Sequence, residues 1–214
     1  MNGLKLQDRL YLGLGRAARY AGRSADAFRP NGPFAPLDPI NRFLRLPATF
    51  VPAKGNEART IIFGEALCQG IFDGSYTRVG DYLVMSTGTF FVASQYPLLP
   101  ILCVRTNRTI SVSRPNMQSA TATNPYGGYT PVNSTVVMTG WPASVLGENR
   151  SSASDAKLPG DQAVPYWAVL LPAPKGIILS SGDIITDDLG RTAVISGSEL
   201  SDLGWRINAK MATT

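Results

Sequence analysis

The sequence predicts a mainly β protein: two small β-barrel or β-sandwich modules, preceded by an amphipathic helix and a proline-rich extended arm. The chain holds 21 glycines and 16 prolines among its 214 residues, which is typical of a protein with many turns. Short runs of β-branched and aromatic residues stand between the turn signals. A weak internal repeat indicates that the strands form two similar modules.

The repeat is centred on two Gly-Asp pairs. Within residues 180–206, Gly182-Asp183 stands eight positions before a turn glycine, and a Gly-Asp pair with the same layout lies upstream. Glycine can adopt the positive φ of a tight turn, and an aspartate can bond the free turn amides. We expect Val92 to match Val194 in this repeat. The expected turn residues of the two modules are Gly80, Asp81, Gly88, Gly182, Asp183 and Gly190.

Residues 4–22 predict the helix. Leu6, Leu10, Leu14, Ala17 and Ala21 recur at helical spacing and form one apolar stripe, while arginines occupy much of the remaining surface. A basic amphipathic helix can lie on an anionic membrane surface. We favour packing on the helix's own domain or on a neighbouring subunit.

Residues 28–52 hold six of the prolines and four phenylalanines, Phe28, Phe34, Phe43 and Phe50. Each proline fixes its own φ and drives the preceding residue towards extended geometry, which argues against a regular helix or a central strand. A flexible linker would not carry so many aromatic rings. The pattern predicts an extended arm that buries its rings, either on a neighbouring subunit or on its own β domain. The expected assembly contacts are Leu6, Leu10, Leu14, Phe28, Phe34, Phe43 and Phe50.

The strand pattern divides the chain into a helix and arm (1–52), a first β module (53–125) and a second β module (126–214). The expected strands lie near residues 60–64, 81–85, 89–93, 101–105, 109–114, 136–146, 166–172, 184–185, 193–195 and 204–211. Two polar loops, 116–135 and 147–162, are candidates for a lumen or for docking on another ring.

Composition excludes several kinds of site. The chain has no histidine, so it cannot form a Ser-His-Asp triad, a Cys-His pair or an HExxH zinc site. Cys68 and Cys103 are too few for a structural zinc site. We expect two buried thiols, and a disulfide between them is the alternative. No apolar run reaches the length of a membrane span, and the start lacks the continuous apolar core of a signal peptide, so we expect folding in a cytoplasm.

No residue pattern predicts catalysis. Asp187 and Asp188 are adjacent, so in a strand they would point to opposite faces, and aspartates favour turns for local hydrogen bonding. No glycine-rich stretch has the spacing of a phosphate-binding loop. The net charge of +5 is mild and includes no dense basic run, so the sequence displays no basic face for nucleic acid. We expect no enzyme, no cofactor and no metal.

The run GDIITDDLGRTAVI, followed by LGWRINA, resembles the core hairpin of head–tail joining proteins of tailed bacteriophages, also called head-completion or stopper proteins. Their pattern is Gly-Asp, then Asp-x-x-Gly-Arg-x-Tyr-x-Val, in a small β-barrel. Ala193 departs from it, where an aromatic residue is expected. Residues 79–115 are similar to proteins of phage and prophage structural gene clusters, so the likeness covers some 60 residues. The matching residues here are Gly182, Asp183, Asp187, Gly190, Arg191 and Val194.

The resemblance implies a ring-forming virion component of the head–tail neck, assembled in the host cytoplasm. Its partners would be other copies of itself, a portal or adaptor ring and tail proteins, with passive contact with passing DNA and no membrane. A heterologous contact between subunits produces a closed ring only if the repeated rotation from one copy to the next returns to the first copy. The alternatives are a capsid decoration protein or a tail-fibre adaptor and, more remotely, a hydrolase using Asp81, Asp183 or Asp187.

Overall fold

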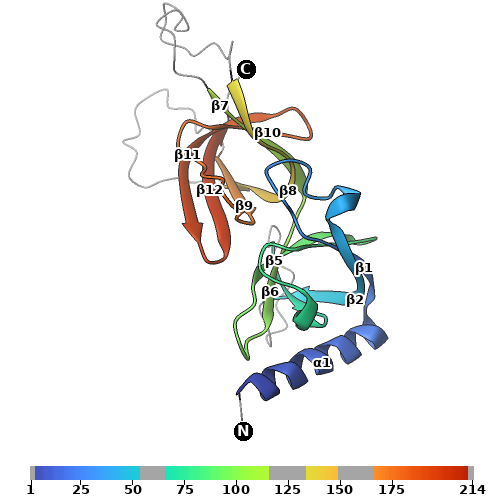
Figure 1. The fold of residues 1–214 in the computed structure, drawn as a ribbon. Coiled ribbons are helices and arrows are strands. Elements are labelled where there is room, and N and C mark those ends of the chain that lie inside the picture. The colour runs from blue at the N-terminus through green and yellow to red at the C-terminus, as the bar shows by residue number, and fades with distance from the viewer. Residues whose placement is uncertain (1–2, 54–65, 116–133, 149–165, 212–214) are drawn as a thin grey trace, which may run out of the picture.

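The computed structural model describes residues 3–53, 66–115, 134–148 and 166–211. These residues form one α-helix, two short 3-10 helices and twelve β-strands, and the strands close into two barrels. Figure 1 shows the second barrel above the first, with the helix beneath the first barrel. The mainly β fold with two barrel modules and an N-terminal helix is therefore confirmed.

The first barrel runs in the order β1-β2-β3-β6-β5-β4, with β4 closing on β1, and all of its pairs are antiparallel. Its strands are β1 (Arg23–Phe28), β2 (Arg42–Pro52), β3 (Leu67–Ile71), β4 (Tyr82–Met85), β5 (Gly88–Ser94) and β6 (Ile101–Arg105). The 3-10 helices η1 (Pro39–Asn41) and η2 (Gly74–Tyr76) lie in its connections. Inward residues such as Phe72, Leu83 and Ile101 form its core.

The second barrel repeats the path of the first, in the order β7-β8-β9-β12-β11-β10. Its strands are β7 (Arg108–Pro115), β8 (Ser134–Glu148), β9 (Tyr166–Leu171), β10 (Ile184–Asp187), β11 (Thr192–Ser201) and β12 (Gly204–Met211). Each strand thus occupies the place of the strand six positions earlier. The internal repeat predicted from about fifteen residues extends over both barrels.

A proline in the second strand of each barrel marks a change of partner. Pro47 in β2 pairs with β1, and β2 pairs with β3 only from Thr49 onward. Pro142 in β8 pairs with β7, and β8 pairs with β9 only from Ser144 onward. Proline lacks the amide proton that a strand paired on both sides needs, so it is tolerated where one side is free.

The boundary between the barrels is only two residues long. The amide and the hydroxyl of Thr106 both donate to the carbonyl of Thr89 in the first barrel, each at 2.9 Å. The side chain of Asn107 donates to and accepts from the backbone of Val145 in the second barrel, at 2.8 Å in both directions. Each half of the linker is therefore fixed to the barrel that it enters.

The barrels also share a buried interface. Tyr82 and Phe91, on the outer face of the first barrel, belong to the same buried cluster as Trp141 of the second. The ring centroids of Tyr82 and Trp141 lie 6.1 Å apart, and the Tyr82 hydroxyl donates to the carbonyl of Pro142 across 2.7 Å. Burial raises the pKa of Tyr82 well above its usual value, so the hydroxyl keeps the proton that it donates.

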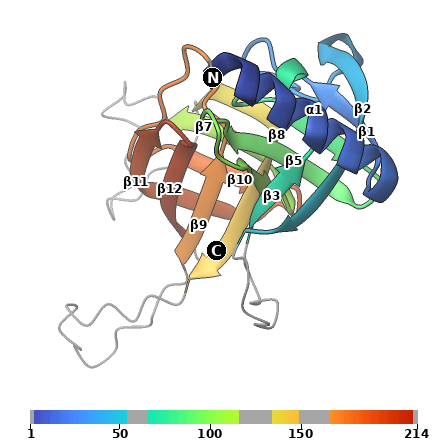
Figure 2. The same cartoon turned by 90° about the horizontal axis from the view of Figure 1, so that it is seen from below.

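The helix α1 (Gly3–Ala21) confirms the helix prediction, but its buried face is turned by about one residue from the expected stripe. Ala18 and Gly15 are buried, and Tyr11 and Leu14 pack against the first barrel's core. Figure 2 shows α1 lying across this barrel. Close contact is possible because Gly15 lies against Asp73, where a Cβ would come within 2.9 Å of the Asp73 Cβ. Leu6, Ala17 and Ala21 are exposed instead.

The expected boundaries at 52/53 and 125/126 shift with the strands. Residues 23–52 supply β1 and β2 of the first barrel, so the region expected to be an extended arm contains two strands. The second barrel begins at Arg108, because β7 belongs to it. Between β1 and β2, residues 29–41 leave the barrel wall, and we call them the arm. The expected strand at 60–64 lies outside the described residues, as do residues 116–133 and 149–162 of the two polar loops.

Candidate functional site

Each barrel holds one aspartate in the same cage of hydrogen bonds. Arg29 donates from Nε and Nη2 to the two carboxylate oxygens of Asp81, at 2.9 and 2.7 Å, and the Arg78 amide adds a third bond. In the second barrel Arg114 donates in the same way to Asp183, at 2.8 and 2.9 Å. Both aspartate side chains are 1% exposed. These carboxylates are held as structural acceptors beside the first residue of β4 and of β10.

The Gly-Asp turns are equivalent down to their backbone. Gly80 and Gly182 have φ values of +91° and +93°. The amide of Gly80 donates to the carbonyl of Val92, and that of Gly182 donates to the carbonyl of Ile195. These four expected turn residues, the two glycines and their aspartates, therefore lie in equivalent turns.

The expected match of Val92 with Val194 is wrong by one residue. Phe91 pairs with Tyr82, and Val194 pairs with Ile184, so Val194 is equivalent to Phe91. The equivalent strand pairs Val84–Thr89 and Thr186–Thr192 enclose four and five residues, so the second hairpin is longer by one residue. As a result Gly190, with φ of +76°, lies in the turn itself, whereas Gly88 is the first residue of β5.

Asp187 stabilises this longer turn from inside it. Its carboxylate accepts from the amides of Leu189 and Arg191 and from the Arg191 guanidinium, the last at 2.6 and 2.8 Å. Burial by itself would raise the pKa of Asp187, but these hydrogen bonds and the Arg191 charge outweigh it and lower the pKa below its ordinary value. Asp187 is therefore ionised and fully bonded, whereas the Asp188 side chain is 44% exposed.

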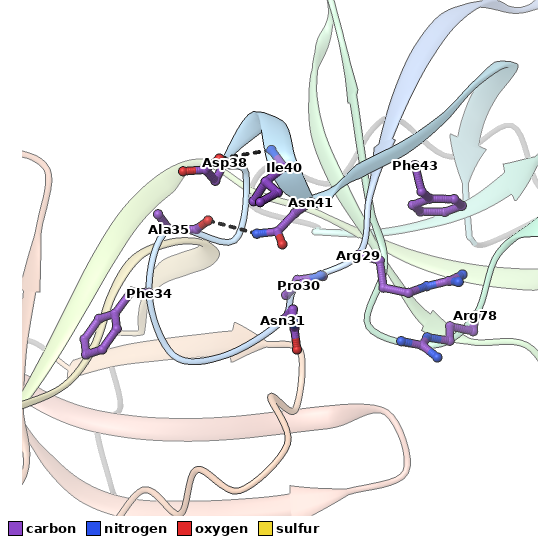
Figure 3. Close-up of a pocket in the computed structure, with 10 residues that line it drawn as sticks. All are labelled: Arg29, Pro30, Asn31, Phe34, Ala35, Asp38, Ile40, Asn41, Phe43 and Arg78. Carbon is purple, nitrogen blue, oxygen red and sulfur yellow. Dashed lines mark hydrogen bonds between the residues drawn. The ribbon is translucent and has the colours of Figure 1, made fainter.

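A groove lies where the arm leaves the first barrel and reaches the second. The arm bonds to β8, since the Ala35 amide donates to the Thr139 carbonyl at 3.0 Å and Trp141 Nε1 donates to the Pro33 carbonyl at 2.7 Å. The hollow has a volume of about 570 Å³. Figure 3 shows the side chains around it, with Asp38 and Asn41 bracing the arm by the hydrogen bonds drawn. Ala35 has a φ of +43°, a conformation that is uncommon for a residue other than glycine.

The groove presents apolar side chains among balanced charges. Ile40 is 87% exposed and Phe34 is 54% exposed. The centre of the Phe43 ring lies 4.3 Å from the Arg29 guanidinium carbon, and the charge of that guanidinium is neutralised by Asp81. Large apolar side chains gathered in an open hollow are typical of a protein contact surface rather than of a small-molecule pocket.

Exposed apolar residues also lie on the β5–β6 loop and at the end of the β11–β12 hairpin, two segments that are in hydrogen-bond contact. Tyr96, in the β5–β6 loop, donates to Asp202 at the tip of the β11–β12 hairpin across 3.2 Å. The Leu98 amide of the same loop donates to the Gln7 side chain of α1. We call this group the loop patch. Its exposed members are Tyr96, Leu98, Leu99, Leu200 and Leu203.

The residues expected to make assembly contacts fall into buried and exposed groups in the structure. Leu14, Phe28 and Phe50 pack against the cores, with the Phe50 ring stacked on Phe90 at 3.7 Å, so they stabilise the fold. Leu10 is half-buried. The expected contacts that remain exposed are Leu6, Phe34 and Phe43. Phe34 and Phe43 both line the groove, on opposite sides of it in Figure 3. The loop patch was missed, because its leucines are scattered between residues 98 and 203.

Other features of the described residues concern metal ligands, thiols and membrane-spanning helices. Within the described ranges there is no group of three or more His, Cys, Asp or Glu side chains that could hold a metal ion. Cys68 and Cys103 are buried free thiols on paired strands, and burial raises the pKa of Cys68 to about 12. Among the described helices, none is long and apolar enough to cross a membrane.

Comparison with known proteins gives no relative: no family model matches the chain, and neither a curated protein nor a solved structure matches it significantly.

Two further signals of the repeat are visible in the sequence once the registers are known. Arg23 and Arg29 recur as Arg108 and Arg114, and both pairs have five residues between them. The segment Leu-Pro-Ala-Thr at 46–49 recurs as Trp-Pro-Ala-Ser at 141–144. Searching for an arginine that could partner each Gly-Asp aspartate would have found the caged carboxylates.

Proposed function

We propose that the protein is a structural component of a tailed-phage virion, a ring-forming subunit of the head–tail neck that joins a portal or adaptor ring to the tail. The observation that carries this proposal is the placement of exposed apolar side chains. They lie along the groove and in the loop patch, at strand ends and in the connections between strands. The phage assignment itself rests on the resemblance of residues 182–194 to head–tail joining proteins.

Two contact surfaces on one rigid body are what a ring subunit needs. The groove lies beside the arm, and the loop patch lies at the meeting point of Tyr96 and Asp202. The short linker and the Tyr82 contact hold the barrels in one orientation, so the two surfaces keep a fixed geometry. A subunit with two different fixed surfaces forms heterologous contacts, which generate a closed ring when the rotation between copies allows it.

The hydrolase alternative is weakened by the bonding of its candidate aspartates. Asp81 and Asp183 each accept two bonds from an arginine, and Asp187 is enclosed by its own turn. A general base needs a free oxygen within reach of a substrate proton. These carboxylates are instead saturated and shielded, which favours the structural role.

Native mass spectrometry tests the proposal on the full chain, alone and mixed with the portal complex of the phage that encodes it. We expect a ring, or addition to the portal in a fixed multiple. Leu99→Ser with Leu200→Ser should abolish the larger species, because both side chains leave the contact. The matched control is Ile178→Ser with Val194→Ser, which changes two exposed apolar residues of the second barrel outside both surfaces.

Other outcomes point elsewhere. Binding to the capsid shell or to the tail tip, without binding to the portal, would assign the chain to the decoration or fibre-adaptor alternative. A chain that stays monomeric with portal, shell and tail tip would overturn the assembly proposal.

A further inference from the structure

The outer face of α1 is a basic stripe. At 100° per residue, Lys5, Arg9, Arg16 and Arg19 fall on one side of the helix, opposite the face that Tyr11, Leu14 and Ala18 bury against the first barrel. All four cations are exposed. The sequence indicated that the surface outside the apolar stripe is basic, and the structure shows that these four cations lie on the exposed side.

These cations differ from most arginines of the barrels. Arg29, Arg45, Arg114 and Arg191 each pair with an aspartate. Within the part of the chain that the structure describes, the four cations of α1 make no ion pair or side-chain hydrogen bond. Their charges remain available for a partner.

The stripe is long and held in place. From Lys5 to Arg19 it extends about 21 Å at a rise of about 1.5 Å per residue. Gly15 and Ala18 seat the helix closely on the barrel, so the cations are presented without ordering the helix first. Double-stranded DNA carries about one phosphate charge per 1.7 Å of its axis, so such a row of cations meets several phosphates.

A membrane surface fits this face less well. Amphipathic helices bind membranes by inserting an apolar face, and the apolar face of α1 is already packed on the barrel. Leu6, Leu12 and Tyr20 are the large apolar side chains that α1 leaves exposed, with Tyr20 93% exposed. At 100° per residue Leu12 lies within the stripe itself, and Leu6 and Tyr20 lie to one side of it, far apart along the helix. Such scattered side chains bury too little area to anchor a helix.

We propose that the outer face of α1 binds the phosphate backbone of double-stranded DNA, independently of base sequence. This inference does not depend on the neck assignment, because it rests on the charge and placement of α1. It also corrects the expectation that no basic face exists.

The test is fluorescence anisotropy of a labelled 30-base-pair duplex, titrated with the full chain at several salt concentrations. With about four phosphate contacts, the logarithm of the binding constant should fall with the logarithm of salt concentration with a slope of about −3.6. The triple variant R9Q/R16Q/R19Q should reduce the magnitude of this slope by about 2.7. Glutamine has a helix propensity similar to that of arginine, so α1 stays folded, and circular dichroism verifies this.

The charge-matched control is R105Q/K175Q/R206Q, which removes three exposed cations from the barrels. It should leave the slope unchanged. Equal weakening by both triple variants would show that net charge, not the stripe, attracts DNA, and would overturn the proposal. So would a wild-type chain that ignores the duplex at low salt, including one that binds vesicles containing phosphatidylserine instead.

Discussion

The hydroxyl of Tyr82 in the first barrel donates a hydrogen bond to the carbonyl of Pro142 in the second, across 2.7 Å and out of contact with water. Its equivalent in the second barrel is Ile184, which is only half-buried. One module of the repeat thus carries an aromatic side chain on its outer wall where the other carries an aliphatic one. The first barrel therefore contributes this aromatic side chain to the contact, and the second barrel contributes no equivalent one from Ile184.

Tyr82→Ala should uncouple the barrels. All three tryptophans lie in the second barrel and both cysteines lie in the first, so fluorescence and thiol exposure report the two modules separately. In the wild type both signals should change at one urea concentration. The variant, losing about 3–5 kcal/mol of packing, should show two separate transitions.

The matched control for this prediction is Ile184→Ala in the second barrel, which should leave the two transitions coincident. Coincident transitions in Tyr82→Ala as well would show that the linker alone couples the barrels.

Asp187→Asn should destabilise the protein by about 1–3 kcal/mol at pH 7, because the arginine and the turn amides lose a charged acceptor. Its neighbour Asp188, exposed and 4.0 Å from the Arg108 Nε, provides the control, and Asp188→Asn should change stability by less than about 0.5 kcal/mol. Urea denaturation of both variants measures the difference. Equal effects would contradict the buried role of Asp187.

The effect of Asp187 should also depend on pH in a defined direction. Its pKa is lower in the folded state than in the unfolded state, so its contribution to stability is complete above the unfolded pKa of about 3.9. The contribution is lost as pH falls from that value through the folded pKa. The stability gap between wild type and Asp187→Asn should therefore be constant from pH 5 to 7 and shrink below about pH 4.

Gly80→Ala and Gly182→Ala should be equally costly, at about 1–2 kcal/mol each. Both glycines have positive φ, and nothing lies within 4 Å of an added Cβ, so backbone strain is the common cause. Gly147, which has open space and ordinary φ, should tolerate alanine with little change. Thermal denaturation would detect a mismatch between the two glycines, which would contradict the equivalence of the turns.

The native thiols should be unreactive. Burial raises the pKa of Cys68 to about 12 and raises that of Cys103 well above its ordinary value, so neither forms thiolate at pH 8. Ellman's reagent should label both only after unfolding. An engineered Thr87→Cys, on the exposed β4–β5 turn, should react at once and serves as the positive control.

The strand predictions show which strands can be located from local sequence patterns alone. The strands around Phe91, Val112 and Val169 lie close to their predicted places, because each is a short β-branched or aromatic run between turn residues. β1, β2 and β3 were missed. Pro47 and its neighbours indicate an irregular segment by every local rule, and only the change of strand partner at that point makes the proline acceptable.

The candidate surfaces were predicted less well than the fold. Phe34 and Phe43 were expected to make contacts, and they do lie exposed at the groove. Phe28 and Phe50 looked the same in sequence, yet they pack on the cores. Hydrophobicity marks a side chain as suited to burial, but it does not say against which surface.

Local sequence was enough to predict the β class, the helix and the two Gly-Asp turns, because short-range periodicity and glycine's freedom at positive φ act locally. Tertiary structure decided the closure of both barrels and the face that α1 buries. It also decided that Asp81 meets Arg29 across 52 residues of chain. These outcomes depend on contacts between segments distant in sequence, which local patterns do not encode. The arginines of α1 were visible in the sequence, but only the tertiary structure decided that they stay exposed and, among the described residues, unpaired.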